Sequence, residues 1–93
     1  MAEILEVHVV VTGRVQGVCF RAATQEAAYR AGVRGWVRNL PGRQVEAVLQ
    51  GERAAVEKVL EFLRVGPPRA NVTDLAVTWR TPGETYRGFD VRY

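Results

Sequence analysis

The stretch LEVHVVVTGRVQGVCFRAATQEAAYRAG, residues 5–32, contains two different hydrophobic patterns joined by a glycine-rich connection. Every second residue of 5–11 is aliphatic, which is typical of a β-strand with one buried face. Residues 21–31 are rich in helix-forming side chains, and a glycine suited to ending a helix follows them. The connection holds Gly13, Gly17 and two arginines, more than an ordinary turn between a strand and a helix requires. The sequence therefore predicts a strand, a specialised loop and a helix in direct succession.

The remaining patterns predict a hairpin, a second helix and two further strands. Residues 33–39 and 45–50 are rich in β-branched and aromatic residues and flank a Pro-Gly turn, which is typical of a β-hairpin. In residues 52–65 apolar side chains recur at i, i+3, i+4 and i+7, which indicates an amphipathic helix, and a Pro-Pro pair follows it. Residues 72–80 and 87–93 are predicted strands around another Pro-Gly turn.

This order of elements is β-α-β-β-α-β with one extra terminal strand. It predicts an α+β fold of the ferredoxin-like, split β-α-β type, in which two helices cover one face of a mostly antiparallel sheet. The whole chain, residues 1–93, is expected to form a single domain. The first two strands are joined by a helical crossover and should run parallel, with the third strand inserted between them. Residues 13–20 and Asn39 are then expected to meet at one edge of the sheet.

Composition and charge limit the classes of function. Apolar residues make up 47% of the chain, so it is globular, and no window of about 18 apolar residues could span a membrane. The start lacks the basic region of a secretory signal, and Cys19 is the only cysteine, which predicts a reducing, cytoplasmic location. The net charge of +3 favours an anionic partner. Because the basic residues alternate with glutamates, no nucleic acid and no membrane surface is expected as that partner.

The loop of residues 13–20 has the composition of an anion-binding site. A glycine-rich turn can point successive backbone N–H groups inward, and the first turn of the following helix adds its own unpaired N–H groups. Arg21 then supplies a planar guanidinium that matches two phosphate oxygens. The alternative is a plain connection with a surface arginine. A P-loop is excluded because no lysine is in place, and Cys19 lies in the wrong position relative to Arg21 for a cysteine-dependent phosphatase.

Two motifs carry a resemblance to a known family. The stretches GRVQGVCFR (13–21) and GWVRN (35–39) closely resemble the two signature stretches of the acylphosphatases, and their separation matches that family. The resemblance extends over nearly the whole chain, including the alanine-rich first helix and FDVRY at the end. One departure is visible, because the hairpin reads Asn39-Leu40-Pro41-Gly42-Arg43 and is one residue shorter than the family's usual turn.

The resemblance implies an enzyme that hydrolyses acyl phosphates to a carboxylate and inorganic phosphate. It implies that Arg21 binds the phosphoryl group and that Asn39 orients the attacking water. It also implies a monomer without cofactor or metal, whose partners are the small-molecule acyl phosphate and inorganic phosphate. Gly13 and Gly17 would permit the backbone angles of the loop. The backbone amides that would complete the phosphate shell are those of Val15, Gln16, Gly17, Val18, Cys19 and Phe20.

Hydrolysis of an acyl phosphate requires few catalytic side chains, which agrees with the small set of candidate residues. The carboxylate leaving group has a conjugate acid of pKa about 4, so it departs without a general acid. Phosphoryl transfer of this kind relies on positioning and on charge stabilisation. No catalytic histidine is therefore needed, and the isolated His8 is interpreted as structural or exposed. Asp74 and Asp90 have no neighbours in sequence that would complete a set of metal ligands.

Two other classes of function remain as alternatives. One is a ferredoxin-like RNA-binding module, since residues 87–93, RGFDVRY, partly match an aromatic RNA-binding pattern. That pattern belongs on the third strand, with a helix after it, which does not fit this position. The other alternative is a regulatory domain that binds phosphate without turnover, and the presence of both Arg21 and Asn39 favours the enzyme.

Overall fold

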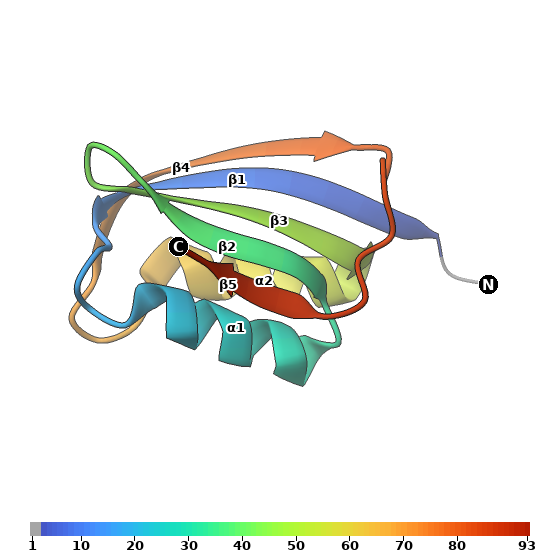
Figure 1. Ribbon diagram of the computed structural model, residues 1–93, viewed down its shortest axis with the longest axis horizontal. Helices are drawn as coiled ribbons and strands as arrows, with labels where there is room; N and C mark the ends of the chain where they lie inside the picture. The colour runs from blue at the N-terminus through green and yellow to red at the C-terminus, as the bar shows by residue number, and fades with distance from the viewer. Residues whose placement is uncertain (1–2) are drawn as a thin grey trace.

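The computed structural model describes residues 3–93 of the chain. Within that range, two helices pack side by side on one face of a five-stranded sheet (Figure 1). The predicted α+β, ferredoxin-like architecture is confirmed. In chain order the elements are β1 (Ile4–Arg14), α1 (Phe20–Ala31), β2 (Arg34–Leu40), β3 (Gln44–Glu52), α2 (Arg53–Val65), β4 (Asn71–Arg80) and β5 (Phe89–Arg92).

The sheet has the strand order β4-β1-β3-β2-β5. Strand β3 pairs antiparallel with both β1 and β2, so it separates two strands that run parallel to each other, as predicted. Strand β4 pairs antiparallel with β1 at one edge, and β5 pairs parallel with β2 at the other edge. The loop after β1 and the end of β2 therefore lie at the same end of the molecule (Figure 1).

The core lies between the sheet and the helices. On β1 the alternate residues Val7, Val9 and Val11 are completely buried, and each stands opposite a buried residue of β3 in the ladder. Helix α2 contributes the apolar face that its sequence predicts, namely Val56, Val59, Leu60 and Leu63. Burial of a side chain of this size stabilises the fold by about 1.5–3 kcal/mol. The aliphatic face of the sheet thus supplies a rigid support for the loops at its ends.

Helix α1 packs mainly through small residues. Its buried side chains are Phe20, Thr24 and Ala28, and the hydroxyl of Thr24 donates to the Phe20 carbonyl at 2.8 Å. Phe20 connects the two helices, because its ring centroid lies 6.4 Å from that of Phe62 on α2. The first residue of α1 is therefore anchored in the core, immediately after the glycine-rich loop.

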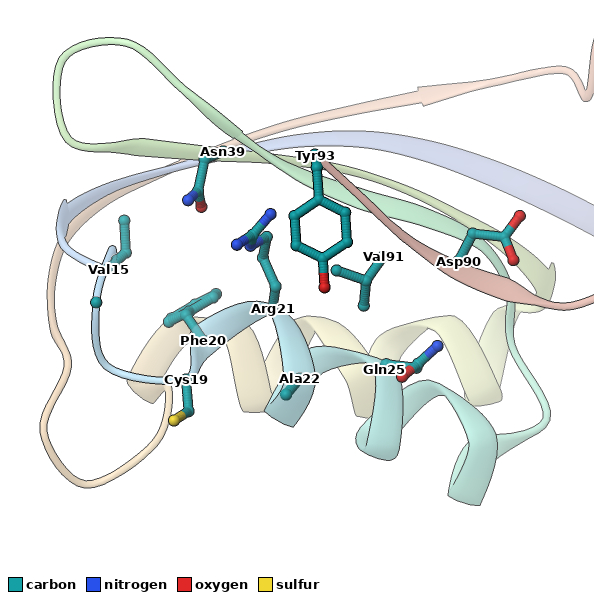
Figure 2. A pocket seen from close by; sticks show the side chains of 11 residues that line it. Val15, Cys19, Phe20, Arg21, Ala22, Gln25, Asn39, Asp90, Val91 and Tyr93 are labelled. Carbon is teal, nitrogen blue, oxygen red and sulfur yellow. The ribbon is translucent and has the colours of Figure 1, made fainter.

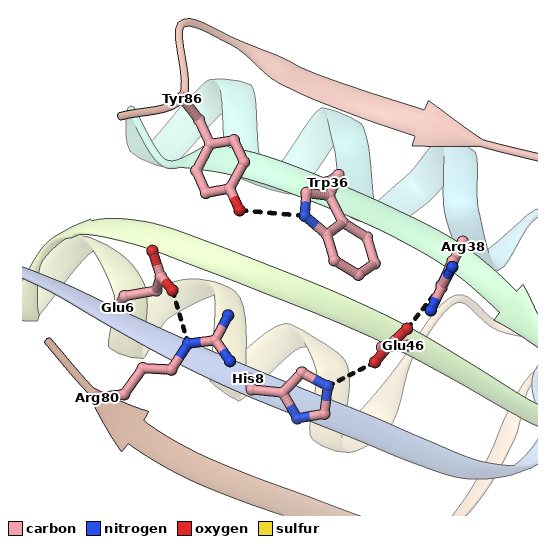
Figure 3. Close-up of polar contacts among 7 residues, drawn as sticks. All are labelled: Glu6, His8, Trp36, Arg38, Glu46, Arg80 and Tyr86. Carbon is pink, nitrogen blue, oxygen red and sulfur yellow. Dashed lines mark hydrogen bonds and ion pairs between the residues drawn. The ribbon is translucent and has the colours of Figure 1, made fainter. Parts of the chain in front are cut away.

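The opposite face of the sheet carries polar side chains that cross-link the strands (Figure 3). Glu6 on β1 is only 3% exposed and lies 2.6 Å from the Arg80 guanidinium on β4. His8 and Arg38 both contact the carboxylate of Glu46, each at 2.6 Å, which ties β1, β3 and β2 together. His8 is therefore a structural residue of the sheet, as its interpretation from the sequence allowed.

The Glu46 carboxylate makes this cross-link dependent on pH. Burial by itself raises the pKa of this carboxyl group, but the hydrogen bonds and charges of His8 and Arg38 hold the pKa below its ordinary value of 4.5. A group whose pKa is lowered on folding stabilises the native state above its unfolded pKa, and that stabilisation is lost as the pH falls. The link between β3 and β2, next to Asn39, therefore weakens as the pH falls into the acid range.

Within residues 3–93, the structure contains no helix long and apolar enough to cross a membrane.

Gly13 lies inside β1, at an irregularity of the pairing with β4, rather than in the loop itself. Its φ is +132°, and a Cβ at this position would lie 2.1 Å from the Asn71 carbonyl oxygen. We therefore expect Gly13→Ala to lower the free energy of unfolding by about 3 kcal/mol or more, because the strands must move apart. Urea denaturation of the purified variant measures this change.

Gly83→Ala is the matched control, because a Cβ at Gly83 meets open space. We expect its free energy of unfolding to stay within about 0.5 kcal/mol of the parent protein. Equal denaturation midpoints for the two variants would contradict the close approach of β1 and β4 at Gly13.

Candidate active site

An open cleft of about 770 Å³ lies where the loop after β1 meets the end of β2. Figure 2 shows its lining, in which Arg21 lies between Asn39 and Tyr93. The expectation that residues 13–20 and Asn39 become neighbours is confirmed, because both segments contribute to the same cleft. The residues that line it are Val15, Gly17, Cys19, Phe20, Arg21, Ala22, Gln25, Asn39, Asp90, Val91 and Tyr93.

The loop between β1 and α1 has an unusual backbone. Gly17 has a φ of +72°, and Cys19, the residue before α1, is also left-handed with φ 60° and ψ 27°. A non-glycine residue in this conformation costs on the order of 1 kcal/mol or more. Such strain persists where the surrounding structure fixes it, and here the buried side chains of Val15 and Phe20 fix both ends of the loop. Packing of the two ends thus holds the loop in a backbone conformation that is unfavourable by itself.

The loop leaves a run of backbone N–H groups without hydrogen-bond acceptors among the described residues. The Val15 N–H group donates to the Gly13 carbonyl at 3.0 Å. In the described part of the chain, the N–H groups from Gln16 to Phe20 have no protein acceptor, and no side chain caps the N-terminus of α1. Because these donors stand at the positive end of a helix dipole, they form a ready site for an anion. Of the backbone amides predicted to bind phosphate, only that of Val15 already donates a hydrogen bond within the described residues.

Arg21 is held over this site by the C-terminal strand. Its Nη1 donates to the Arg92 carbonyl oxygen at 2.9 Å, and its guanidinium carbon lies 4.5 Å from the centre of the Tyr93 ring. Within residues 3–93 no carboxylate pairs with Arg21, so its charge is not neutralised locally. A guanidinium has several N–H donors, and those not directed at Arg92 remain for a ligand.

Asn39 points its side-chain amide into the same hollow, facing the loop (Figure 2). Its Oδ1 atom is buried and has no hydrogen-bond partner among the described residues. A buried acceptor without a donor costs about 1–3 kcal/mol, and native proteins keep such atoms mainly where water or a ligand supplies the donor. The orphaned oxygen is therefore a candidate acceptor for a bound donor.

The shortened hairpin leaves the position of Asn39 in the ladder intact. Asn39 stands opposite Val45 and Leu40 opposite Gln44, so regular pairing continues to the turn. The turn itself closes through left-handed residues, with φ 79° at Gly42 and 61° at Arg43.

The side chains of two residues of the predicted loop, Cys19 and Gln16, do not point into the cleft (Figure 2). Cys19 is exposed, and its sulfur points away from the cleft, which agrees with its interpretation as a bystander (Figure 2). The Gln16 side chain contacts the β2–β3 hairpin instead of lining the cleft. No group of three or more potential metal-ligating side chains occurs in the part of the chain that the structure describes.

Sequence reasoning did not identify the wall of the cleft formed by β5. Asp90, Val91 and Tyr93 line it because β5 pairs with β2 at the edge of the sheet, directly beside α1. The terminal strand was predicted, but its neighbour in the sheet was not. Gln25 was also missed, and its amide donates to the Phe89 carbonyl at 2.8 Å, which fastens α1 to β5.

Comparisons with known proteins agree with this arrangement. The acylphosphatase family model matches residues 7–91. The acylphosphatase of Anaeromyxobacter sp. (strain Fw109-5) is 48% identical over 93 residues, which cover 100% of both chains. The crystal structure of acylphosphatase from Bacillus subtilis has a TM-score of 0.92 and 35% identity, covering 96% of this chain and 99% of that one. The acylphosphatase structure from Coxiella burnetii has a TM-score of 0.91 and 38% identity, covering 96% and 93% of the two chains. The chain therefore belongs to the acylphosphatase family.

Proposed function

We propose that Arg21, the loop amides and Asn39 carry out the hydrolysis of acyl phosphates in this acylphosphatase. The loop N–H groups and Arg21 hold the phosphoryl group, and Asn39 holds the water that attacks it. The products are a carboxylate and inorganic phosphate. The observation that carries this assignment is the orphaned Oδ1 of Asn39, which faces an uncompensated guanidinium beside a set of free N–H groups.

The donor set is strong enough to bind a phosphoryl dianion without further cations. Hydrogen bonds to a charged group contribute about 1.5–3 kcal/mol each. Millimolar affinity corresponds to about 4 kcal/mol, which two or three such bonds supply. The N–H groups from Gln16 to Phe20 and the guanidinium of Arg21 offer more donors than that. Binding through protein donors alone is therefore adequate for a small substrate.

The proposed reaction is a direct displacement by water. The Asn39 oxygen accepts a hydrogen from the water, which aims an oxygen lone pair at phosphorus. A new O–P bond forms while the P–O bond to the acyl group breaks, and the carboxylate leaves with the electron pair. The water proton passes to a phosphoryl oxygen. Because the leaving carboxylate has a conjugate acid of pKa about 4, no side chain has to protonate it.

We further propose that the chain acts as a cytoplasmic monomer. Both catalytic candidates and all of the donors come from one chain, so the cleft is complete without a second copy. The exposed thiol of Cys19 favours a reducing compartment, where it would stay unoxidised.

Arg21→Ala should weaken phosphate binding and turnover together, because the guanidinium contacts the phosphoryl oxygens in the ground state and in the transition state. We expect kcat/KM for benzoyl phosphate to fall about 10³-fold or more, with a rise in the inhibition constant of inorganic phosphate. Arg30→Ala is the matched control on the same helix, where an exposed arginine pairs with Glu26 and with no other carboxylate of residues 3–93. A similar loss in both variants would show that the effect of Arg21 is not local.

Asn39→Ala should separate catalysis from stability. We expect kcat to fall about 10²- to 10³-fold, while the inhibition constant of inorganic phosphate changes by less than about threefold. Removing an unpaired buried oxygen should leave the free energy of unfolding unchanged or raise it by up to about 1 kcal/mol. Steady-state kinetics and urea denaturation measure the two effects, and Asn71→Ala on the exposed surface of β4 serves as the control. An unaltered kcat would remove Asn39 from the mechanism.

Chelation of divalent metals should not affect the reaction, because the proposed charge stabilisation comes from protein donors. We expect equal rates of benzoyl phosphate hydrolysis before and after prolonged treatment with EDTA. A rate that falls with EDTA and returns with added Mg²⁺ would contradict the metal-independent mechanism.

A further inference from the structure

Gln16 belongs to the glycine-rich loop, but its side chain reaches across to the β2–β3 hairpin. Its Nε2 atom lies 2.6 Å from the Leu40 carbonyl oxygen and 3.0 Å from the Gln44 carbonyl oxygen. Leu40 ends β2, Gln44 begins β3, and the two are partners in the ladder. One NH₂ group therefore uses both of its hydrogens on the two carbonyls that close the hairpin.

This contact joins two parts of the site that follow or belong to strands not paired directly with each other. Strand β3 lies between β1 and β2, so roughly 10 Å separates the two strands that carry the site. The free N–H groups follow β1, whereas Asn39 is in β2. The Gln16 side chain passes the start of β3 and reaches the residue that directly follows Asn39. A second link is farther from Asn39, where the Gly13 N–H donates to the Arg43 carbonyl in the turn at 3.1 Å.

We propose that Gln16 is a positioning residue that sets the distance between the phosphate-binding amides and the Asn39 side chain. This proposal rests on the proposed function, because it requires Asn39 to hold the attacking water. An in-line attack needs the reacting atoms about 3–3.5 Å apart, and a displacement of about 1 Å can lower the rate roughly 10²-fold. A side chain that ties the two halves together therefore affects the attack more than it affects binding of phosphate.

Because the contact is exposed, we expect its loss to change catalysis without changing the stability of the fold. The Gln16 side chain is exposed, as are both of its hydrogen bonds, so water can satisfy the two carbonyls when the amide is removed. The backbone ladder between β2 and β3 does not depend on the amide. Loss of the amide should leave each half of the site formed and remove the link nearest to Asn39, while the Gly13–Arg43 hydrogen bond remains.

Gln16→Met provides the direct test, because methionine matches glutamine in length but has no donor. We expect kcat for benzoyl phosphate to fall about 10- to 10²-fold, while the inhibition constant of inorganic phosphate changes by less than about threefold. The control is Gln44→Met, which removes a different side-chain amide, one that lies 3.2 Å from the Thr12 hydroxyl on the polar face of the sheet. That control should keep the kcat of the parent protein. An unchanged kcat in Gln16→Met, or a phosphate inhibition constant that worsens as much as kcat, would overturn the proposal.

A double-mutant cycle with Asn39→Ala shows whether Gln16 acts through Asn39. In the Asn39→Ala background the water is no longer held, so we expect Gln16→Met to change kcat by less than about twofold. An equal loss in both backgrounds would indicate a general structural role and would overturn the proposal, while the role of Asn39 would stand. If Asn39→Ala alone leaves kcat unchanged, the proposed function fails, and the inference about Gln16 fails with it.

Discussion

The consecutive backbone N–H groups from Gln16 to Phe20 have no hydrogen-bond acceptor within the described residues. The surrounding structure prevents these groups from forming hydrogen bonds within the protein. A chain left to itself would satisfy such donors by extending the helix or by capping it with a side chain. Both routes are closed here. Gly17 and Cys19 turn the backbone through the left-handed region, and the residue at the N-cap position is a cysteine that makes no capping bond. The strained loop is compensated by burial of Val15 and Phe20 at its ends.

Much of this arrangement could be predicted from the sequence, because it follows from local periodicity and chain connectivity. Alternation in residues 5–11 and the helical period in residues 52–65 predict the elements, and the handedness of a crossover connection places β3 between β1 and β2. That topology alone brings the loop to Asn39. Arg21 was expected at the first turn of the helix, and the structure has it there, one residue after the buried Phe20.

The features that sequence reasoning missed depend on packing between distant segments. Nothing local to residues 89–93 indicates that β5 pairs with β2 or that Tyr93 lies under the Arg21 guanidinium. The side chain of Gln16 is equally unpredictable, since a glutamine in a phosphate-binding loop could as well face the ligand. Its partners are backbone carbonyls, whose positions depend on how the distant hairpin folds and not on which side chains it carries.

Two kinds of interaction hold β2 before and after Asn39. On the polar face, Arg38 is bound to the Glu46 carboxylate, which His8 also contacts, so the strand is fixed one residue before Asn39. Gln16 contacts the strand one residue after Asn39, at the Leu40 carbonyl oxygen. Asn39 itself keeps an unpaired buried oxygen. The contacts of Arg38 and Leu40 restrain the backbone on both sides of Asn39. In the proposed mechanism this unpaired acceptor holds the attacking water beside the anion site, and the leaving carboxylate needs no proton.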